Sequence, residues 1–216
     1  MSTDAPLPAL DGPRVPPLSG TARSLVILAH GYGSNGADLI GLVPHWREAL
    51  ADTAFVSPNA PYDCPGAPGG FQWWGFGAGG ARSDGMKSAA PILDAFIDAE
   101  LARLGLGDDR LALVGFSQGT MLSLYVGPRR ERQIAGIVGL SGALIDTGEA
   151  PRTRPPILLV HGDEDPMVPI DAFYRAKETL EREGFELTTH VSPGLGHGVD
   201  LAGLTLGKRF LSRVLA

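Results

Sequence analysis

The chain has 216 residues, of which 44% are hydrophobic and 19% charged, a balance that excludes a disordered chain and fits one globular domain. Its net charge of -6 and the shortness of its longest basic cluster, residues 129–132, argue against nucleic-acid or phosphate binding. No apolar run approaches the roughly 20 residues that span a bilayer, and residues 1–20 lack the pattern of a secretory signal.

These features predict a single domain over residues 1–216, with residues 1–21 as a surface arm. The single cysteine, Cys64, allows no internal disulfide and fits a reducing compartment. We therefore expect a cytoplasmic protein without stable membrane insertion. The sequence leaves a homodimer open.

Short apolar runs alternate along the chain with longer helical patterns, which is typical of an α/β fold with a mostly parallel central sheet and helices on both faces. The expected strands are residues 25–30, 54–57, 111–115, 134–140, 157–161 and 186–191. The expected helices are residues 37–51, 87–104, 118–125, 170–183 and 201–215, with Pro44 breaking the first of them in two. Residues 59–82 form a long loop rich in Pro, Gly and aromatic residues, and a loop of that length is more often functional than idle.

Gly115-Phe116-Ser117-Gln118-Gly119 fits the pattern G-x-S-x-G directly after a predicted strand and before a predicted helix. In this pattern a serine occupies a tight strand-to-helix turn, and the small flanking residues let the chain bend. The alternative is a serine that only caps the helix. The strand immediately before the motif and the helix immediately after it favour the tight turn. Ser117 is therefore the predicted nucleophile.

A serine hydroxyl needs a nearby base, and the base needs a third group to orient it. In this fold the chain order is serine, acid, histidine, which leaves His190 and His197 as bases. His190 lies inside a predicted strand, whereas His197 lies in a Gly-rich loop after it, so we expect His197 to be the base. Asp165 is the expected acid because it lies far enough beyond the strand to turn back over the sheet, whereas Asp163 is expected to bind turn amides.

Acyl transfer also needs amide donors for the developing oxyanion. We expect one from the backbone of Gln118 and one from Tyr32, in the loop after the first predicted strand. Residues 31–36 also satisfy G-x-G-x-x-G, so a dinucleotide-dependent oxidoreductase using Gly31, Gly33 and Gly36 is an alternative, but no acidic residue ends the next strand to hold a ribose.

Several motifs together resemble the phospholipase/carboxylesterase family of α/β hydrolases, which includes the acyl-protein thioesterases. The matching segments run in family order: His30-Gly31-Tyr32-Gly33, Pro58-Asn59-Ala60-Pro61, Gln72-Trp73-Trp74, residues 115–119, Leu140-Ser141-Gly142, residues 161–169 and Gly196-His197. The resemblance implies a cofactor-free serine esterase with little or no lid and places Ser117, Asp165 and His197 on the family's triad positions. The chain departs from the family at Gly75, where an acidic residue is more common, and in the Gly-rich insert 75–80.

The expected activity is hydrolysis of small carboxylic esters, with short to medium acyl esters, lysophospholipids and thioesters all open, and without a metal. Trp73 and Trp74, with Phe71 and Phe76, are either core residues under the long loop or the wall of a substrate pocket. A non-catalytic binding protein on a hydrolase scaffold is a third hypothesis, although one of nucleophile, base or acid would then be expected to be missing.

Overall fold

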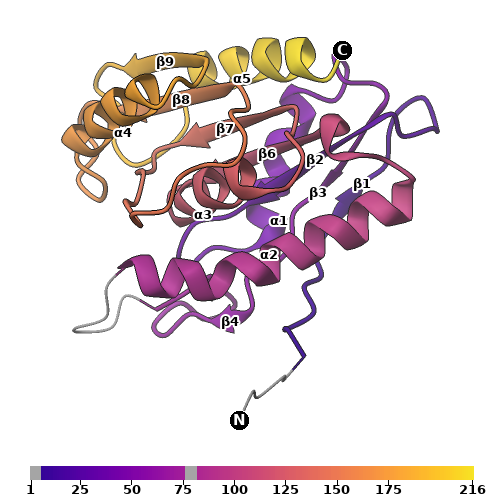
Figure 1. Cartoon of the computed structure of the whole chain (residues 1–216), viewed down its shortest axis with the longest axis horizontal. Helices are drawn as coiled ribbons and strands as arrows, with labels where there is room; N and C mark the ends of the chain where they lie inside the picture. Colours follow the sequence, from indigo (N-terminus) through magenta and orange to yellow (C-terminus); the bar gives the residue numbers. More distant parts are fainter. Residues whose placement is uncertain (1–5, 76–81) are drawn as a thin grey trace.

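A seven-stranded sheet forms the centre of the computed structural model, which describes residues 6–75 and 82–216 (Figure 1). The strand order is β1-β3-β2-β6-β7-β8-β9, and every neighbouring pair is parallel except β1 and β3. The strands are β1 Arg14–Val15, β2 Ser24–Ala29, β3 Thr53–Val56, β6 Leu111–Phe116, β7 Gly136–Leu140, β8 Ile157–Gly162 and β9 Leu187–Ser192. Two further short strands, β4 Tyr62–Asp63 and β5 Phe71–Gln72, form a separate hairpin.

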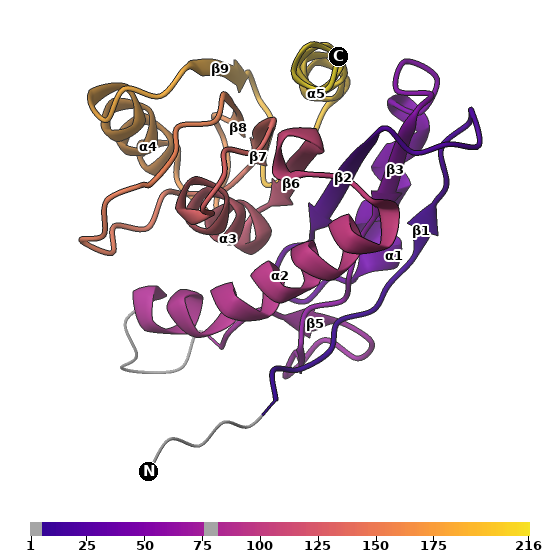
Figure 2. The same cartoon turned by 45° about the vertical axis from the view of Figure 1, so that its right-hand side comes forward.

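Helices cover both faces of the sheet (Figure 2). One face carries α2 Arg82–Leu104, α3 Gln118–Val126 and α4 Ile170–Arg182, and the other carries α1 Gly36–Leu39, the 3₁₀ helix η1 Ile40–His45 and α5 Leu201–Val214. Two shorter 3₁₀ helices are η2 Asp108–Arg110 and η3 Gly127–Arg129. The arrangement confirms the predicted α/β fold.

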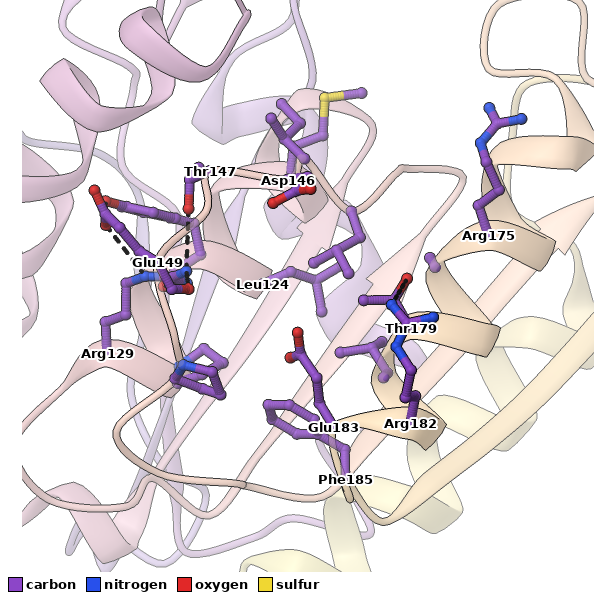
Figure 3. A pocket seen from close by; sticks show the side chains of 18 residues that line it. Leu124, Arg129, Asp146, Thr147, Glu149, Arg175, Thr179, Arg182, Glu183 and Phe185 are labelled. Atoms are coloured by element: carbon purple, nitrogen blue, oxygen red, sulfur yellow. Dashed lines mark hydrogen bonds and ion pairs between the residues drawn. The ribbon is translucent and has the colours of Figure 1, made fainter.

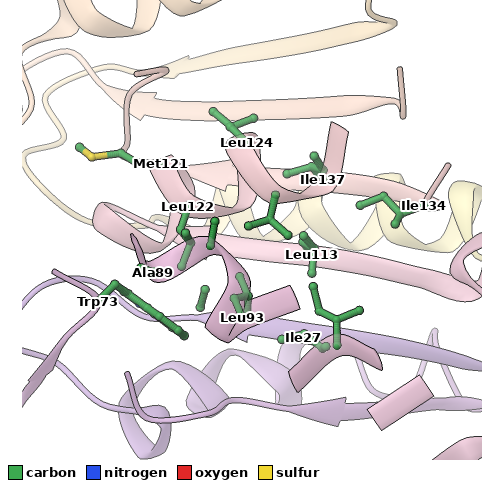
Figure 4. Packing of buried hydrophobic residues seen from close by; sticks show 14 of the residues in the cluster. Ile27, Trp73, Ala89, Leu93, Leu113, Met121, Leu122, Leu124, Ile134 and Ile137 are labelled. Carbon is green, nitrogen blue, oxygen red and sulfur yellow. The ribbon is translucent and has the colours of Figure 1, made fainter. Parts of the chain in front are cut away.

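Alternate residues of the central strands enter two separate cores, which is why these strands are apolar throughout. Leu25 and Ile27 of β2 face α2 and α3, whereas Val26 and Leu28 face α5 and the η1 side. In the first core, Trp73 packs near Ala89 and Leu122 (Figure 4). A strand buried on both faces has no polar side to display, so the continuous apolar runs follow directly from the position in the sheet.

The six predicted strands and the last four predicted helices are present, with shifts of a few residues at their ends. The helix expected over residues 37–51 is wrong: only α1 is α-helical, and η1, which contains Pro44, is followed by turns. Proline lacks the N–H that a continuing α-helix would use and crowds the preceding turn, so the chain tightens into a 3₁₀ helix there.

The two irregular segments also hold structure that the sequence analysis did not predict. Within the expected arm, β1 adds an antiparallel edge strand to β3, while residues 1–5 lie outside the described residues. Within the expected loop, the β4–β5 hairpin forms and α2 begins at Arg82. Each of these strands has two residues, which is too few to show the alternation of apolar and polar residues that indicates a strand.

The strand order places a topological switch between β2 and β6. From β2 the chain moves outward to β3, whereas from β6 it moves in the opposite direction through β7, β8 and β9. In open parallel sheets the crevice at such a switch, beyond the carboxyl ends of the strands, is where ligands bind. The loops after β2 and β6 are those that hold the predicted oxyanion donor and nucleophile.

Candidate active site

Ser117 occupies a sharp turn between β6 and α3. Its backbone has φ 53° and ψ -114°, a left-handed φ that is costly for a residue with a side chain. A Cβ on Gly115 would lie 2.4 Å from the Cα of Thr120, and one on Gly119 would lie 1.8 Å from the carbonyl oxygen of Ala29. Both flanking positions therefore require glycine, and the G-x-S-x-G motif is explained by close approach of the turn to its own helix and to β2.

Asp165 and His197, which are 32 residues apart, meet beyond the carboxyl ends of β8 and β9. The His197 Nδ1 atom lies 2.7 Å from Asp165 Oδ2. The other carboxylate oxygen, Oδ1, accepts hydrogen bonds from the amides of Met167 at 2.8 Å and Val168 at 2.9 Å. The carboxylate is thus fixed by the backbone on one side and presents its free oxygen to the imidazole.

The environment of Asp165 favours its ionised form. Burial alone would raise the pKa of this carboxyl, but the hydrogen bond with His197 and the two backbone amides outweigh it and hold the pKa below its ordinary value. His161 also lies close, with Nε2 at 3.4 Å from Asp165 Oδ2, while the same nitrogen contacts the carbonyl oxygen of Val168 at 2.8 Å. A buried, ionised acid bound to an imidazole is the arrangement that orients a histidine base.

The loop that holds His197 is anchored at several points. Ser141, just after β7, donates from its hydroxyl to the carbonyl oxygen of Gly198 at 2.8 Å, and its own φ is 46°. Asp163 Oδ1 accepts from the Gly194 amide at 2.6 Å, which confirms the expectation that Asp163 binds turn amides. The imidazole of His197 lies 5.0 Å, between ring centroids, from Phe116, the residue before Ser117. These contacts hold the imidazole beside the end of β6, directly before the predicted nucleophile.

Ser141 was not singled out from the sequence as a site residue. The signal available for it was the Leu140-Ser141-Gly142 motif, which directly follows a predicted strand. A Cβ on Gly142 would lie 2.3 Å from the Thr120 Cβ, so the chain is tightly packed at this point as well.

The loop after β2 lies against the turn that holds Ser117. A Cβ on Gly31 would lie 3.2 Å from Ser117 Cβ, so Gly31, the residue before Tyr32, is an immediate neighbour of the predicted nucleophile. Gln118 is the first residue of α3, where a backbone N–H has no acceptor within its own helix. The two predicted oxyanion donors thus come from the two loops at the topological switch.

Trp73 and Trp74 are both buried. The indole Nε1 of Trp73 donates to the carbonyl oxygen of His30, and its backbone N–H donates to Gln118 Oε1 at 3.0 Å. The side chain of Gln118 in turn donates to the carbonyl oxygen of Trp74 at 2.8 Å. Both tryptophans are therefore core residues that contact the residues flanking the predicted site. Phe76 and the rest of the Gly-rich insert after Gly75 lie outside the described residues.

The alternative base, His190, lies on β9, and its Nε2 atom is buried without a hydrogen-bond partner in the described part of the chain.

In the glycine pattern of residues 31–36, Gly36 is used for packing. Its amide donates to Asn59 Oδ1 at 2.8 Å, and a Cβ on Gly36 would lie 2.0 Å from the Ser57 carbonyl oxygen. The following helix, α1, has only four residues. A dinucleotide site needs that amide and a long helix for its pyrophosphate, so the local geometry disfavours this alternative.

A groove of about 360 Å³ lies away from these residues, between α3, the segment after β7, and α4 (Figure 3). Leu124, Leu180 and Phe185 contribute apolar lining, and Arg129 on one wall contacts Thr147 and Glu149. Ser117, Asp165 and His197 are not among its lining residues. The groove is therefore distinct from the candidate site.

Within residues 6–75 and 82–216, no group of three or more His, Cys, Asp or Glu side chains is arranged to hold a metal ion. Over the same residues, no helix is both long enough and apolar enough to cross a membrane.

Comparison with known proteins identifies the family of this chain. The profile of the phospholipase/carboxylesterase family matches residues 10–215. The chain belongs to this family. It is accordingly a serine hydrolase with the α/β-hydrolase fold, in a family that hydrolyses esters and thioesters.

Named relatives of this phospholipase/carboxylesterase chain are esterases and thioesterases. It is 28% identical to acyl-protein thioesterase 1 of Gibberella zeae, over 94% of this chain and 95% of that protein. It is also 28% identical to the esterase YpfH of Escherichia coli, over 83% of this chain and 78% of that protein. Among solved structures, esterase PE8 superposes with a TM-score of 0.91 at 40% identity, covering 96% of this chain and all of that one.

Proposed function

We propose that this protein is a carboxylesterase in which Ser117 is the nucleophile, His197 the general base and Asp165 the acid that orients it. The backbone amides of Tyr32 and Gln118 form the oxyanion hole. Trp73 and Trp74, both buried, support this site as core residues through their hydrogen bonds with His30 and Gln118 and do not form an open pocket wall.

In the first half of the reaction, the Ser117 oxygen forms a bond to the carbonyl carbon of the ester while His197 Nε2 accepts the hydroxyl proton. The two amides stabilise the negative charge on the carbonyl oxygen. The bond to the leaving alcohol then breaks, and His197 returns the proton to the alcohol oxygen. Water repeats these steps on the acyl-enzyme and releases the carboxylic acid.

The observation that carries the proposal is the 2.7 Å contact between His197 Nδ1 and an Asp165 carboxylate that two backbone amides already hold. With Nδ1 engaged as the donor to Asp165, Nε2 is the nitrogen left to accept a proton. The left-handed backbone of Ser117 and the imidazole beside Phe116 support the same assignment.

For the substrate we propose short to medium acyl esters, because side chains on both sides of the proposed site are open to solvent. Tyr32 and Met167, beside the proposed donor and acid, are exposed at 40% and 72%. Initial rates on p-nitrophenyl esters of increasing acyl length, on a thioester of matched chain and on a lysophospholipid would test this. A preference for the lysophospholipid or for long acyl chains would contradict it.

Replacing Ser117 by alanine tests the nucleophile. We expect Ser117→Ala to lower kcat on a p-nitrophenyl ester by about 10⁶-fold while the protein stays folded, by analogy with another serine hydrolase. The matched control is Ser123→Ala, which removes a buried hydroxyl without a hydrogen-bond partner among the described residues from the same helix and should leave the rate unchanged. A Ser117→Ala enzyme that keeps a tenth of the wild-type rate would refute the assignment.

A further inference from the structure

His30, the residue directly after β2, is completely buried and uses both of its ring nitrogens. Its Nε2 atom accepts the backbone N–H of Ala60 at 2.9 Å. Its Nδ1 atom lies 2.7 Å from the carbonyl oxygen of Gly31. Since a backbone amide can only donate, Nε2 carries no proton, and Nδ1 must carry the one that is donated to Gly31.

The surroundings keep His30 neutral. Burial lowers the pKa of this imidazole and outweighs the hydrogen bond to Gly31, which acts in the opposite direction. Protonation would also place a second N–H against the Ala60 amide, where two donors would face each other. The ring is therefore held in one tautomer, with Nδ1 as the donor.

The carbonyl that His30 binds belongs to the same peptide unit as the Tyr32 amide. No cis peptide occurs in the described part of the chain, so this unit is trans and its C=O and N–H point in opposite directions. With the Gly31 oxygen turned toward the buried ring, the Tyr32 N–H is turned away from it. Gly31 itself lies against Ser117, since a Cβ on it would be 3.2 Å from Ser117 Cβ.

Rotation of this peptide turns about ψ of Gly31 and φ of Tyr32, and Gly31 has no side chain to restrict it. The Gly31 oxygen is held by the His30 ring and by the Ser34 amide at 3.2 Å. If the peptide rotated by half a turn, a carbonyl oxygen would replace the amide, and it would repel the oxyanion. The hydrogen bond from the His30 ring to the Gly31 oxygen therefore opposes this rotation.

The same contacts join His30 to the second proposed donor. The carbonyl oxygen of His30 accepts from Trp73 Nε1 at 2.9 Å, and the Trp73 backbone binds the side chain of Gln118 at 3.0 Å. The two loops that supply the proposed donors are therefore linked through Trp73.

We propose that neutral His30 is a positioning residue that fixes the Gly31–Tyr32 peptide so that the Tyr32 amide serves the oxyanion hole. This inference rests on the proposed function, because it takes the Tyr32 amide as an oxyanion donor. His30 does not touch the substrate and acts only through this peptide.

Two near-isosteric substitutions separate the two ring nitrogens. Asparagine places an amide N–H near the position of Nδ1, and glutamine places its amide group near Nε2. We expect His30→Gln to lower kcat by about 10²-fold, the effect of losing one oxyanion donor, with KM changed less than about threefold. His30→Asn should recover most of kcat, because it can still donate to the Gly31 oxygen.

A second readout is the affinity for a trifluoromethyl ketone, which binds as an oxyanion. Its inhibition constant should rise in His30→Gln by the same factor by which kcat/KM falls, and not in His30→Asn. Thr53→Val is the matched control, since it breaks the buried 2.8 Å hydrogen bond to Ser24 at the other end of β2, far from the loop. It should lower stability while leaving kcat and the inhibition constant of the folded enzyme unchanged.

Nitrogen-15 NMR of histidine-labelled wild-type enzyme tests the tautomer without any substitution that could impair folding. We expect a protonated Nδ1 and an unprotonated Nε2 for His30 between pH 6 and 8. A protonated Nε2 would overturn the proposal, as would equal kcat for the Gln and Asn variants. Failure of the proposed function is distinguishable, because it would appear as activity in Ser117→Ala, whatever the His30 variants do.

Discussion

Asp163 and Asp165 lie two residues apart in the turn after β8, yet their carboxylates bind different groups. Asp165 contacts His197 and two amides of its own turn, whereas Asp163 binds the Gly194 amide. We expect Asp165→Asn to lower kcat by about 10⁴-fold, because an amide there no longer fixes the imidazole in its productive tautomer. Asp163→Asn should cost roughly 1 kcal/mol of stability and leave kcat of the folded enzyme nearly intact.

Each substitution could disturb the other residue, so kcat must be compared on variants whose unfolding has also been measured. Chemical denaturation followed by circular dichroism provides the folded fraction for both. A stable but inactive Asp163→Asn, paired with an active Asp165→Asn, would transfer the role of acid to Asp163.

The ionisation of Asp165 also makes stability depend on pH. The pKa of this carboxyl is lower in the folded protein than in the unfolded chain, where it is about 3.9. Its stabilising contribution is therefore fully present above that value and is lost as the pH falls through the folded pKa. We expect the difference in unfolding free energy between wild type and Asp165→Asn to shrink as the pH is lowered from about 5 to about 2, through the unfolded and then the folded pKa, measured by urea denaturation. A difference that stays constant over this range would contradict the account.

At the level of single residues, motif and chain order were enough to select a histidine and an aspartate that the structure brings into contact. Motif and chain order did not reveal the contact of Ser141 with the loop that holds His197, or the contact of His30 with the Gly31 carbonyl. Both residues act by binding a backbone carbonyl, of Gly198 and of Gly31. A sequence pattern identifies side chains with reactive chemistry, but which carbonyl a buried side chain meets depends on packing between distant segments.

At the level of secondary structure, α3 can hold Ser117 at the edge of the sheet only because it lies directly on β2. Gly119 is the contact point: a Cβ there would lie 1.8 Å from the Ala29 carbonyl oxygen and 2.8 Å from that of His30. Backbone atoms cannot move aside as a flexible side chain would. We expect Gly119→Ala to destabilise the fold by about 3 kcal/mol, at the upper end of the usual cost of overpacking.

The control for this variant is Gly41→Ala in η1, where a Cβ would meet nothing within 4 Å and the residue is exposed. Its unfolding free energy should equal or slightly exceed that of the wild type. If Gly119→Ala has the same midpoint of denaturant unfolding as the wild type, the claim that α3 packs closely on β2 at Gly119 is wrong.

The elements that the sequence predicted well are those with a long repeated pattern. In α2, Leu93, Ile97 and Leu101 recur at helical spacing and are all buried. The pattern was misleading over residues 37–51, where apolar residues at helical spacing belong to a short helix, a 3₁₀ turn and further turns. There Trp46 is buried by tertiary contacts, and its Nε1 donates to the Leu204 carbonyl oxygen in α5 at 2.9 Å, a partner that local spacing cannot reveal.

At the scale of the whole molecule, the position of the site follows from strand order. The loops after β2 and β6 are neighbours because these strands pair, although they begin at residues 30 and 117, far apart in the chain. The sequence indicated a parallel sheet, but not which strands lie side by side, because pairing between distant segments leaves no periodic signal. The order β3-β2-β6-β7 creates the switch at which the predicted nucleophile and oxyanion loop meet.

Covalent trapping tests the central claim, that this crevice is a serine esterase site with Ser117 as its nucleophile. The wild-type enzyme is incubated with a fluorophosphonate, and the intact mass and the modified peptide are determined while esterase activity is followed. We predict one adduct per chain, located on Ser117, formed in step with the loss of activity and much more slowly in His197→Ala than in His190→Ala. An adduct on another serine, or full inactivation without modification of Ser117, would contradict the account.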